Sequence, residues 1–351
     1  MSLRLESVDS CNAAIHDDSS KTTRARGGTV LTEFESDYRP TMATVDPFGA
    51  QRSVSPMDSP VVERIAGSLG AVVHGLDAWA LTNDGLATIR AALLEHLVVF
   101  LPNQAADLDQ LEAFTDRLGG RDLTPYVQSV KGRPFVIRVI KEANDQLNFA
   151  NAWHTDLSYL AAPPSFTVLH AWDVPSFGGD TIWANQYLAY ETLPAELRQQ
   201  LLGMTATHSA GMAYGTGGYL QSVADQSSMT ILPSADAHNS QTHPAVIRHP
   251  DSGRSALYIN PVYTTGLRRT TAGPAADSSQ PMPGDAALLA RLARHSVNEN
   301  FTCRMRWQPG MLAIWDNRCT QHFAINDYSG QRREMFRTSV RGSAPIAATN
   351  E

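Results

Sequence analysis

The first sustained hydrophobic pattern in the chain is helical. Between residues 82 and 94, leucine and isoleucine side chains recur at i, i+3, i+7 and i+8, and Thr82 stands where a helix N-cap is expected. The apolar run 97–101 that follows is short and continuous, which predicts a buried strand. A second amphipathic helix is predicted from about 107 to 118, because Gly119-Gly120 stops it.

Beyond residue 130 the pattern changes to short β-type runs separated by Pro and Gly turns. Helical inserts are predicted at about 194–202 and 285–294, and the Pro/Ala/Ser-rich segment 270–284 is typical of a long loop. The whole pattern predicts a mainly β fold with flanking helices, arranged as an antiparallel barrel or jelly roll. The predicted strands are Phe135–Ile140, Phe166–Trp172, Thr181–Ala184, Ala245–Arg248, Ala256–Asn260, Met311–Asp316 and Met335–Val340.

The N-terminal part of the chain lacks such a pattern. Residues 1–58 are rich in Ser, Thr and Asp and have no sustained apolar period, which is typical of a flexible extension. Folded material is expected to begin near Val61. We expect one domain over 59–345 and a short C-terminal tail over 346–351.

Composition and charge narrow the possible partners. Of the 351 residues 42% are hydrophobic, which is enough for a core, but no run approaches the ~18–20 apolar residues of a membrane helix and no secretory signal is present. The net charge of −7 and the short basic clusters disfavour nucleic acid as a partner. The three cysteines are widely spaced without a CxxC, so a disulfide framework is not expected and a cytoplasmic location fits.

Two histidines and one aspartate stand out as candidate metal ligands. His154 and Asp156 are two residues apart, so on an extended segment both side chains project to one face. An imidazole and a carboxylate at one point are two of the three ligands of a 2-His-1-carboxylate triad, the arrangement that binds Fe(II) and leaves positions open. The third ligand is expected from a distant strand on the opposite side of the barrel, and His322 follows a strongly β-patterned run.

Two arginines follow this last histidine at even spacing. Arg333 and Arg337 are four residues apart, so on one strand both point to the same face. Two inward guanidiniums are very costly to bury unless each meets an anion. The pattern therefore predicts two anionic ligands, or one ligand and one acidic residue.

These residues lie in motifs that resemble the TauD/TfdA family of Fe(II)- and 2-oxoglutarate-dependent dioxygenases. The resemblance covers about residues 61–342 in one order. It rests on the segments GAVVHGLD and HLVVFLPNQ, on WHTD at 153–156, on GGDT at 178–181, and on the run WDNRxTQHxAxNDY at 315–328 followed by the two arginines. It implies a double-stranded β-helix of the jelly-roll, cupin-like type.

The resemblance also implies a role for each motif residue. His154, Asp156 and His322 are expected to bind Fe(II), while Thr181 and Arg333 bind 2-oxoglutarate, with O2 as the third reactant. Arg337 is expected to bind the anionic group of a small organic substrate, such as a sulfonate, sulfate ester or carboxylate. Because Asp156 is retained where related halogenating enzymes carry a small residue, hydroxylation of a C–H bond is expected, with succinate and CO2 as products.

The substrate itself is less constrained by the motifs. The taurine enzyme of the family has a histidine before a proline at the substrate site, and Thr124 takes its place here, which disfavours taurine. Trp153 is expected to border the substrate pocket. The segment 210–240 is predicted to be a lid, and its Tyr214, Tyr219 and Met212 favour a bulkier or more apolar substrate.

Two other functions fit part of the pattern. A zinc hydrolase could use the same three ligands with a metal-bound water, but its mechanism would not require Thr181 or Arg333. A non-catalytic small-molecule-binding barrel would not need an intact triad. Family members commonly form dimers or tetramers, so a homo-oligomer is expected.

Overall fold

The computed structural model of the chain describes residues 60–269 and 285–349. The predicted extension 1–58 and the predicted loop 270–284 lie outside the described residues. The first described strand starts at Val61, where folded material was expected to begin. None of the helices within these two ranges is long and apolar enough to span a membrane.

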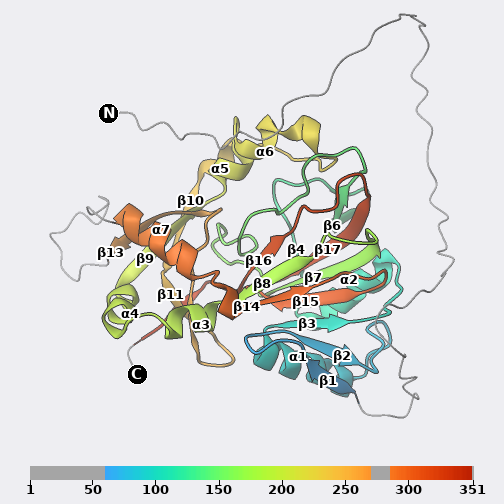
Figure 1. Cartoon of the computed structure of the whole chain (residues 1–351), viewed down its shortest axis with the longest axis horizontal. Helices are drawn as coiled ribbons and strands as arrows, with labels where there is room; N and C mark the ends of the chain where they lie inside the picture. Colours follow the sequence, from blue (N-terminus) through green and yellow to red (C-terminus); the bar gives the residue numbers. More distant parts are fainter. Residues whose placement is uncertain (1–59, 270–284, 350–351) are drawn as a thin grey trace, which may run out of the picture. The chain divides into compact units, whose positions relative to one another are not determined.

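The largest sheet has nine strands and is antiparallel except for the β2–β3 pair. Its order is β1-β2-β3-β15-β7-β17-β6-β5, and β4 also pairs with β17. Strands from distant parts of the sequence therefore lie side by side in its middle (Figure 1). The strands are β1 (Val61–Arg64), β2 (Ala71–His74), β3 (Val98–Leu101), β4 (Arg121–Asp122), β5 (Ser129–Val130), β6 (Arg133–Lys141), β7 (Phe166–Asp173), β15 (Leu312–Asp316) and β17 (Arg333–Val340).

Two helices cover one face of this sheet. They are α1 (Asn83–His96) and α2 (Leu108–Leu118), close to their predicted bounds, and α1 is capped by the Thr82 hydroxyl as expected. Because side chains alternate along a strand, Val99 and Leu101 pack toward these helices, while Val98 and Phe100 pack on the other face. The other face of the sheet packs against a second layer of strands.

That second layer is a three-stranded sheet of order β14-β8-β16. Trp183 of this sheet meets Phe100 and Trp315 of the large sheet, with ring centroids 5.2 and 5.8 Å apart. The strands are β8 (Thr181–Asn185), β14 (Thr302–Met305) and β16 (Thr320–Ala324). The fold is mainly β with flanking helices, as predicted, but the described strands form separate sheets and not one closed barrel.

A third hydrophobic cluster is built from α3, α4, α7 and strands β9, β11, β12 and β13, among the remaining described elements. Two further three-stranded sheets have the orders β10-β9-β13 and β12-β11-β18. Their strands are β9 (Met204–Ser209), β10 (Ser240–Pro244), β11 (Val246–Arg248), β12 (Ser255–Leu257), β13 (Thr264–Arg269) and β18 (Ile346–Ala347). The helices here are α3 (Gln186–Glu191), α4 (Ala195–Leu202), α5 (Gly211–Tyr214), α6 (Tyr219–Ser222) and α7 (Asp285–His295), with the 3-10 turns η1 (Ala224–Gln226), η2 (Ala235–His238) and η3 (Glu299–Phe301).

The end of the described chain carries a short strand. The tail expected over 346–351 contains β18, whose Ile346 and Ala347 pair with β11. Ala348 is buried and donates its amide to the Val246 carbonyl. Strand pairing therefore continues past residue 345, and the reason is the free edge that β11 offers to the chain end.

Buried neutral histidines make the fold acid-sensitive. Burial lowers the pKa of His170 to about 4 and that of His208 to about 3. The unfolded chain, with a histidine pKa near ~6.5, binds protons more readily, so stability falls as pH drops below that value, by roughly 3 kcal/mol for His170 alone. We expect the melting temperature of the metal-free protein to fall between pH 7 and 4, followed by circular dichroism. A His170→Gln variant should show a shallower decline over that range, and an equally steep one would contradict this assignment.

Candidate functional site

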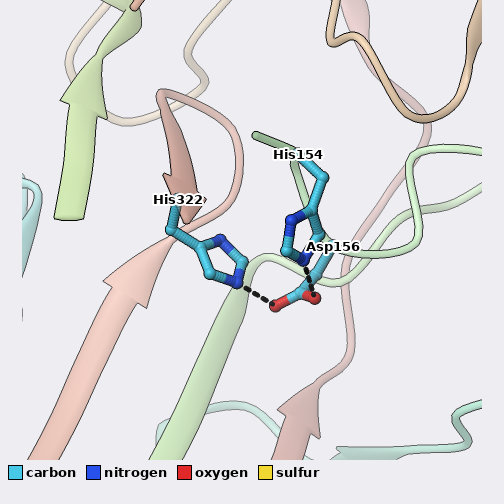
Figure 2. A group of neighbouring side chains, drawn as sticks. All are labelled: His154, Asp156 and His322. Carbon is cyan, nitrogen blue, oxygen red and sulfur yellow. Dashed lines mark ion pairs between the residues drawn. The ribbon is translucent and has the colours of Figure 1, made fainter. Parts of the chain in front are cut away.

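The two histidines and the aspartate selected from the sequence lie together in a buried cluster. The Nε2 atom of His154 is 3.6 Å from one oxygen of Asp156, and Nε2 of His322 is 3.9 Å from the other. Figure 2 shows both rings directed at the carboxylate. All three donor atoms lie within 4.8 Å of one another, which suits a single metal ion.

The backbone explains how residues so far apart in sequence meet. His154 and His322 form an antiparallel bridge and exchange both amide-to-carbonyl hydrogen bonds, at 3.1 and 2.8 Å. The expectation that the third ligand comes from the opposite side of a barrel is therefore wrong, because His322 is the backbone neighbour of His154. Leu157, directly after Asp156, has φ of 51°, so the chain turns sharply just beyond the carboxylate.

The hydrogen-bond pattern leaves these side chains ready to bind a cation. His154 donates its Nδ1 proton to the Ala152 carbonyl oxygen at 2.7 Å, so Nε2 is the ring nitrogen that faces the carboxylate and can bind a metal ion. Burial lowers the pKa of His322 to about 3, which keeps that ring neutral. Two imidazole lone pairs and a carboxylate repel one another unless a cation lies between them.

Arg337 provides positive charge at the same carboxylate. Its Nη1 donates to Oδ1 of Asp156 at 3.1 Å, and both side chains are buried. Burial alone disfavours the charged carboxylate, but the positive charge of Arg337 outweighs this effect and holds the pKa of Asp156 well below its usual range. Arg337 thus has an acidic residue as its partner, one of the two arrangements that the sequence predicted, while its Nε finds no partner among the described residues.

A second positively charged site lies at the other end of β17. Arg333 is on the same strand as Arg337, is equally buried, and has no hydrogen-bond partner for Nε and Nη2 within the described chain. Burial lowers its pKa. Lys141, which faces Arg333 in the β17–β6 register, places its ammonium 4.5 Å from the Tyr328 ring centre. Two cations therefore gather here without a carboxylate at hydrogen-bond distance from Arg333, in the part of the chain that the structure describes.

Thr181 is held beside this second site by its own motif. Gly178 has φ of 72°, and a Cβ there would lie 2.6 Å from Oδ1 of Asp327, so the turn before Thr181 needs glycine. The Thr181 oxygen accepts from the Trp307 indole at 3.0 Å, and the guanidinium of Arg333 lies 5.7 Å from the centre of that indole. Since the oxygen already accepts, the hydroxyl proton of Thr181 is available to an anion.

Tyrosines form the wall beside the three candidate ligands. Tyr263 lies against His154, with ring centroids 6.3 Å apart, and against Tyr159 at 4.8 Å. Tyr126 and Tyr214 complete the cluster around Tyr159 at 5.9 and 6.3 Å. The hydroxyl of Tyr159 is buried and has no hydrogen-bond partner among the described residues. This tyrosine wall, Tyr126, Tyr159, Tyr214 and Tyr263, presents both aromatic surface and hydroxyl groups.

Other residues proposed for the substrate pocket are placed differently. Thr124 is buried close to Tyr126 in sequence, and it is the Tyr126 ring that joins the tyrosine wall. Trp153 is half-buried and its ring packs on Phe323 at 5.7 Å. In the predicted lid, Tyr214 belongs to the wall, whereas Met212 is 73% and Tyr219 53% exposed. The expected contribution of Met212 and Tyr219 to the pocket is therefore not seen.

A second cluster of residue types that can bind metal has a structural role. His249, Asp316 and Cys319 lie close together and are buried. Nδ1 of His249 accepts from the amides of Asp251 and Ser252, so its proton is on Nε2 and is donated to Asp316 at 3.0 Å. Arg318 donates to both oxygens of the same carboxylate. With every donor engaged, this cluster stabilises the turn between β15 and β16, and β16 is the strand that carries His322.

Comparison with known proteins agrees with this geometry. The family model described as taurine catabolism dioxygenase TauD, TfdA family matches residues 61–339. The chain belongs to the TauD/TfdA family. An alkylsulfatase of Acinetobacter baylyi is 32% identical over 295 residues, which is 82% of this chain and 86% of that protein. An alpha-ketoglutarate-dependent sulfate ester dioxygenase of Pseudomonas putida is 32% identical over 298 residues, 83% and 92% of the two chains.

A solved structure extends this likeness to three dimensions. The crystal structure of a putative alpha-ketoglutarate-dependent taurine dioxygenase from Burkholderia xenovorans has a TM-score of 0.65 and 30% identity, and covers 82% of this chain and 95% of that one. In this TauD/TfdA chain, sequence reasoning missed Trp307, Thr167 and three of the four wall tyrosines. Trp307 lies two residues before Pro309-Gly310, and no spacing pattern connects it to Thr181. Only the fold brings these residues to the site.

Proposed function

We propose that this protein is an Fe(II)- and 2-oxoglutarate-dependent dioxygenase that hydroxylates a C–H bond of a small anionic organic substrate. The observation that carries the proposal is the convergence of His154, Asp156 and His322 on one buried point, with a buried arginine beside it. The family to which the chain belongs and the names of its relatives support the same reaction class.

The donor set fits Fe(II). His154 and His322 offer neutral Nε2 atoms and Asp156 a carboxylate oxygen, which is the 2-His-1-carboxylate set of non-haem iron oxygenases. Bound Fe(II), with 2-oxoglutarate and O2, supplies oxidation of the C–H bond while 2-oxoglutarate becomes succinate and CO2. The protein's own part is to hold the three ligand atoms, exclude water and orient the two anions.

The binding site for 2-oxoglutarate is the cluster around Trp307. Arg333 brings unpartnered guanidinium nitrogens, and Thr181 a hydroxyl proton that no described residue accepts. A carboxylate placed between them satisfies both, since a guanidinium pairs with a carboxylate through two parallel hydrogen bonds. Lys141 adds positive charge nearby. A dicarboxylate with one end here can extend its other end toward the metal ligands.

The primary substrate binds between Arg337 and the tyrosine wall, and alkyl sulfate esters are the class we propose first. Among the described residues, Nε of Arg337 and the hydroxyl of Tyr159 have no partner, so both can donate to a sulfate oxygen while the rings contact the alkyl group. The relatives named as an alkylsulfatase and a sulfate ester dioxygenase support this choice. Hydroxylation of the carbon that carries the ester oxygen gives a hemiacetal sulfate, which collapses to an aldehyde and sulfate.

We also infer that the strands form a double-stranded β-helix. The large sheet and the β14-β8-β16 sheet pack face to face through Trp183. His322 belongs to the small sheet and Arg337 to the large one, so the site lies where the two layers meet. Likeness to the solved structure at 30% identity supports this arrangement.

The proposal is tested by substrate-dependent succinate formation. Alkyl sulfates, sulfonates, aryloxyalkanoates and amino acids are incubated with Fe(II), 2-oxoglutarate and O2, and succinate and sulfate are measured. We expect alkyl sulfates to raise succinate above the uncoupled rate and to release sulfate in equal amount. Sulfate release without 2-oxoglutarate would indicate the zinc hydrolase. Tight binding of these anions without succinate would indicate a non-catalytic barrel.

Replacing Arg337 with alanine is expected to lower kcat/KM for the best anionic substrate by about 100-fold, on the order of 3 kcal/mol for a lost buried charge pair. Arg332→Ala is the matched control, because Arg332 lies just before β17 and pairs with Glu142, Asp173 and Glu334 instead. Steady-state kinetics on the substrate panel provide the measurement. An unchanged preference for anions in Arg337→Ala would remove Arg337 from the substrate site.

A further inference from the structure

A chain of buried hydrogen bonds ends on the carboxylate of Asp156. The Trp315 indole donates to Oδ1 of Asn317 at 3.1 Å, the Asn317 amide donates to Oγ1 of Thr167 at 2.9 Å, and the Thr167 hydroxyl donates to Oδ2 of Asp156 at 2.7 Å. Every member is buried. Nothing in the proposed reaction requires Thr167 or Asn317, so their position needs another explanation.

The chemistry of the two end groups fixes the donor-to-acceptor direction of this series of hydrogen bonds. An indole N–H can only donate and an ionised carboxylate can only accept. Asn317 must therefore turn its oxygen to Trp315 and its amide nitrogen to Thr167, which leaves the Thr167 proton for Asp156. Because each group has one possible orientation, the chain holds Oδ2 of Asp156 in one place.

The other carboxylate oxygen has different neighbours. Oδ1 of Asp156 faces Nε2 of His154 at 3.6 Å and accepts from Arg337 at 3.1 Å. Thr167 stands on β7, opposite Trp315 in the β15 register, so its position is set by the large sheet. Asp156 itself belongs to a loop that turns at Leu157. The threonine thus ties a loop carboxylate to the rigid sheet.

We propose that Thr167 is a positioning residue for the metal site: it fixes the plane of the Asp156 carboxylate so that Oδ1 is presented to the ion beside His154. The inference rests on the proposed role of Asp156 as a metal ligand. Without the Thr167 hydroxyl the carboxylate can rotate toward Arg337, which competes with the ion for the same oxygen. The expected consequence is weaker metal binding in an otherwise intact fold.

Metal affinity of the full chain gives the test. Mn(II) is titrated into the metal-free protein without 2-oxoglutarate or O2, and free Mn(II) is counted by electron paramagnetic resonance. Thr167→Val keeps the side-chain shape and removes the hydroxyl, and we expect its Kd for Mn(II) to rise about 10- to 100-fold. Thr167→Ser keeps the hydroxyl and should bind within about threefold of the parent protein, since the donor to Oδ2 is retained.

A matched control separates positioning from general loss of stability. Thr115 is equally buried, and its hydroxyl bonds to that of Thr338 at 2.7 Å between α2 and β17. Thr115→Val should lower the melting temperature of the metal-free protein without changing the Kd for Mn(II). Asn317→Ala breaks the chain one step earlier and should weaken Mn(II) binding in the same direction, which keeps the test available should Thr167→Val not fold.

The outcomes distinguish this inference from the proposed function. Equal Mn(II) affinity in the parent protein, Thr167→Val and Asn317→Ala would overturn the positioning role and leave the dioxygenase proposal intact. A parent protein that binds no Mn(II) and forms no succinate would overturn the proposed function itself. Weakened binding in Thr167→Val, restored in Thr167→Ser, is the result that supports the inference.

Discussion

Replacing His322 with alanine is expected to abolish turnover of 2-oxoglutarate, lowering kcat by about three orders of magnitude or more, on the order of 4 kcal/mol of lost transition-state stabilisation. The physical reason is that His154 and Asp156 then offer two ligand atoms, too few to hold the ion with a fixed geometry. We expect the Kd for Mn(II) to rise in parallel. Succinate formation and Mn(II) titration of the same preparation measure both effects.

His170→Ala is the matched control for this prediction. His170 is as buried as His322, but it lies on β7, where its ring bonds to the Gln104 carbonyl and to Trp172. Both variants lose a buried imidazole, so both are expected to lose stability. Only His322→Ala should lose metal binding. A His322→Ala protein that retains Mn(II) and succinate formation would show that the three residues do not form the metal site.

Much of the candidate metal site was predictable because it depends on local spacing. The two-residue separation of His154 and Asp156 and the four-residue separation of Arg333 and Arg337 each specify a shared face on extended backbone. In the structure His154 lies beside Asp156, and Arg333 and Arg337 are both buried on β17. The spatial proximity of His322 and His154 was not predictable in this way. It depends on a backbone bridge between segments that are 168 residues apart in the sequence.

Two of the strands that the sequence analysis missed share a physical feature. β9 and β10 carry buried histidines, His208 and His243, where an apolar residue would have marked the inward face. Their ring centroids are 5.3 Å apart, and Nδ1 of His208 forms a hydrogen bond with the hydroxyl of Ser158, two residues after Asp156. Polar side chains therefore fill the buried positions of β9 and β10, so the hydrophobic periodicity of the sequence does not reveal these strands.

The tyrosine wall was hidden for another reason. Its four members come from four separate segments, and each tyrosine alone is an ordinary aromatic residue in the sequence. Only Tyr214 was selected in advance, as part of a presumed lid. A pocket wall that is assembled from distant segments leaves no spacing pattern in the sequence, so only the folded structure reveals it.

Arg333 offers the sharpest test of how stability and function oppose each other in this fold. Its guanidinium is buried, with two nitrogens that lack partners among the described residues, and burial lowers its pKa. A buried cation without its anion destabilises the protein. We therefore expect Arg333→Met to stabilise the protein in the absence of 2-oxoglutarate, by roughly 1–3 kcal/mol in free energy of unfolding, because an apolar side chain of similar length replaces an uncompensated charge.

The same substitution is expected to raise the KM for 2-oxoglutarate by about 100-fold or more, since each hydrogen bond to a charged group contributes roughly 1.5–3 kcal/mol and two are lost. Mn(II) affinity without 2-oxoglutarate should stay unchanged, which separates this variant from His322→Ala.

Arg332→Met is the control for this prediction. It removes the ion pairs of Arg332 with Glu142, Asp173 and Glu334, so the free energy of unfolding should fall slightly and the KM for 2-oxoglutarate should not change. A destabilised Arg333→Met protein with an unaltered KM would show that the 2-oxoglutarate carboxylate binds elsewhere. Chemical denaturation and initial-rate kinetics decide between these results.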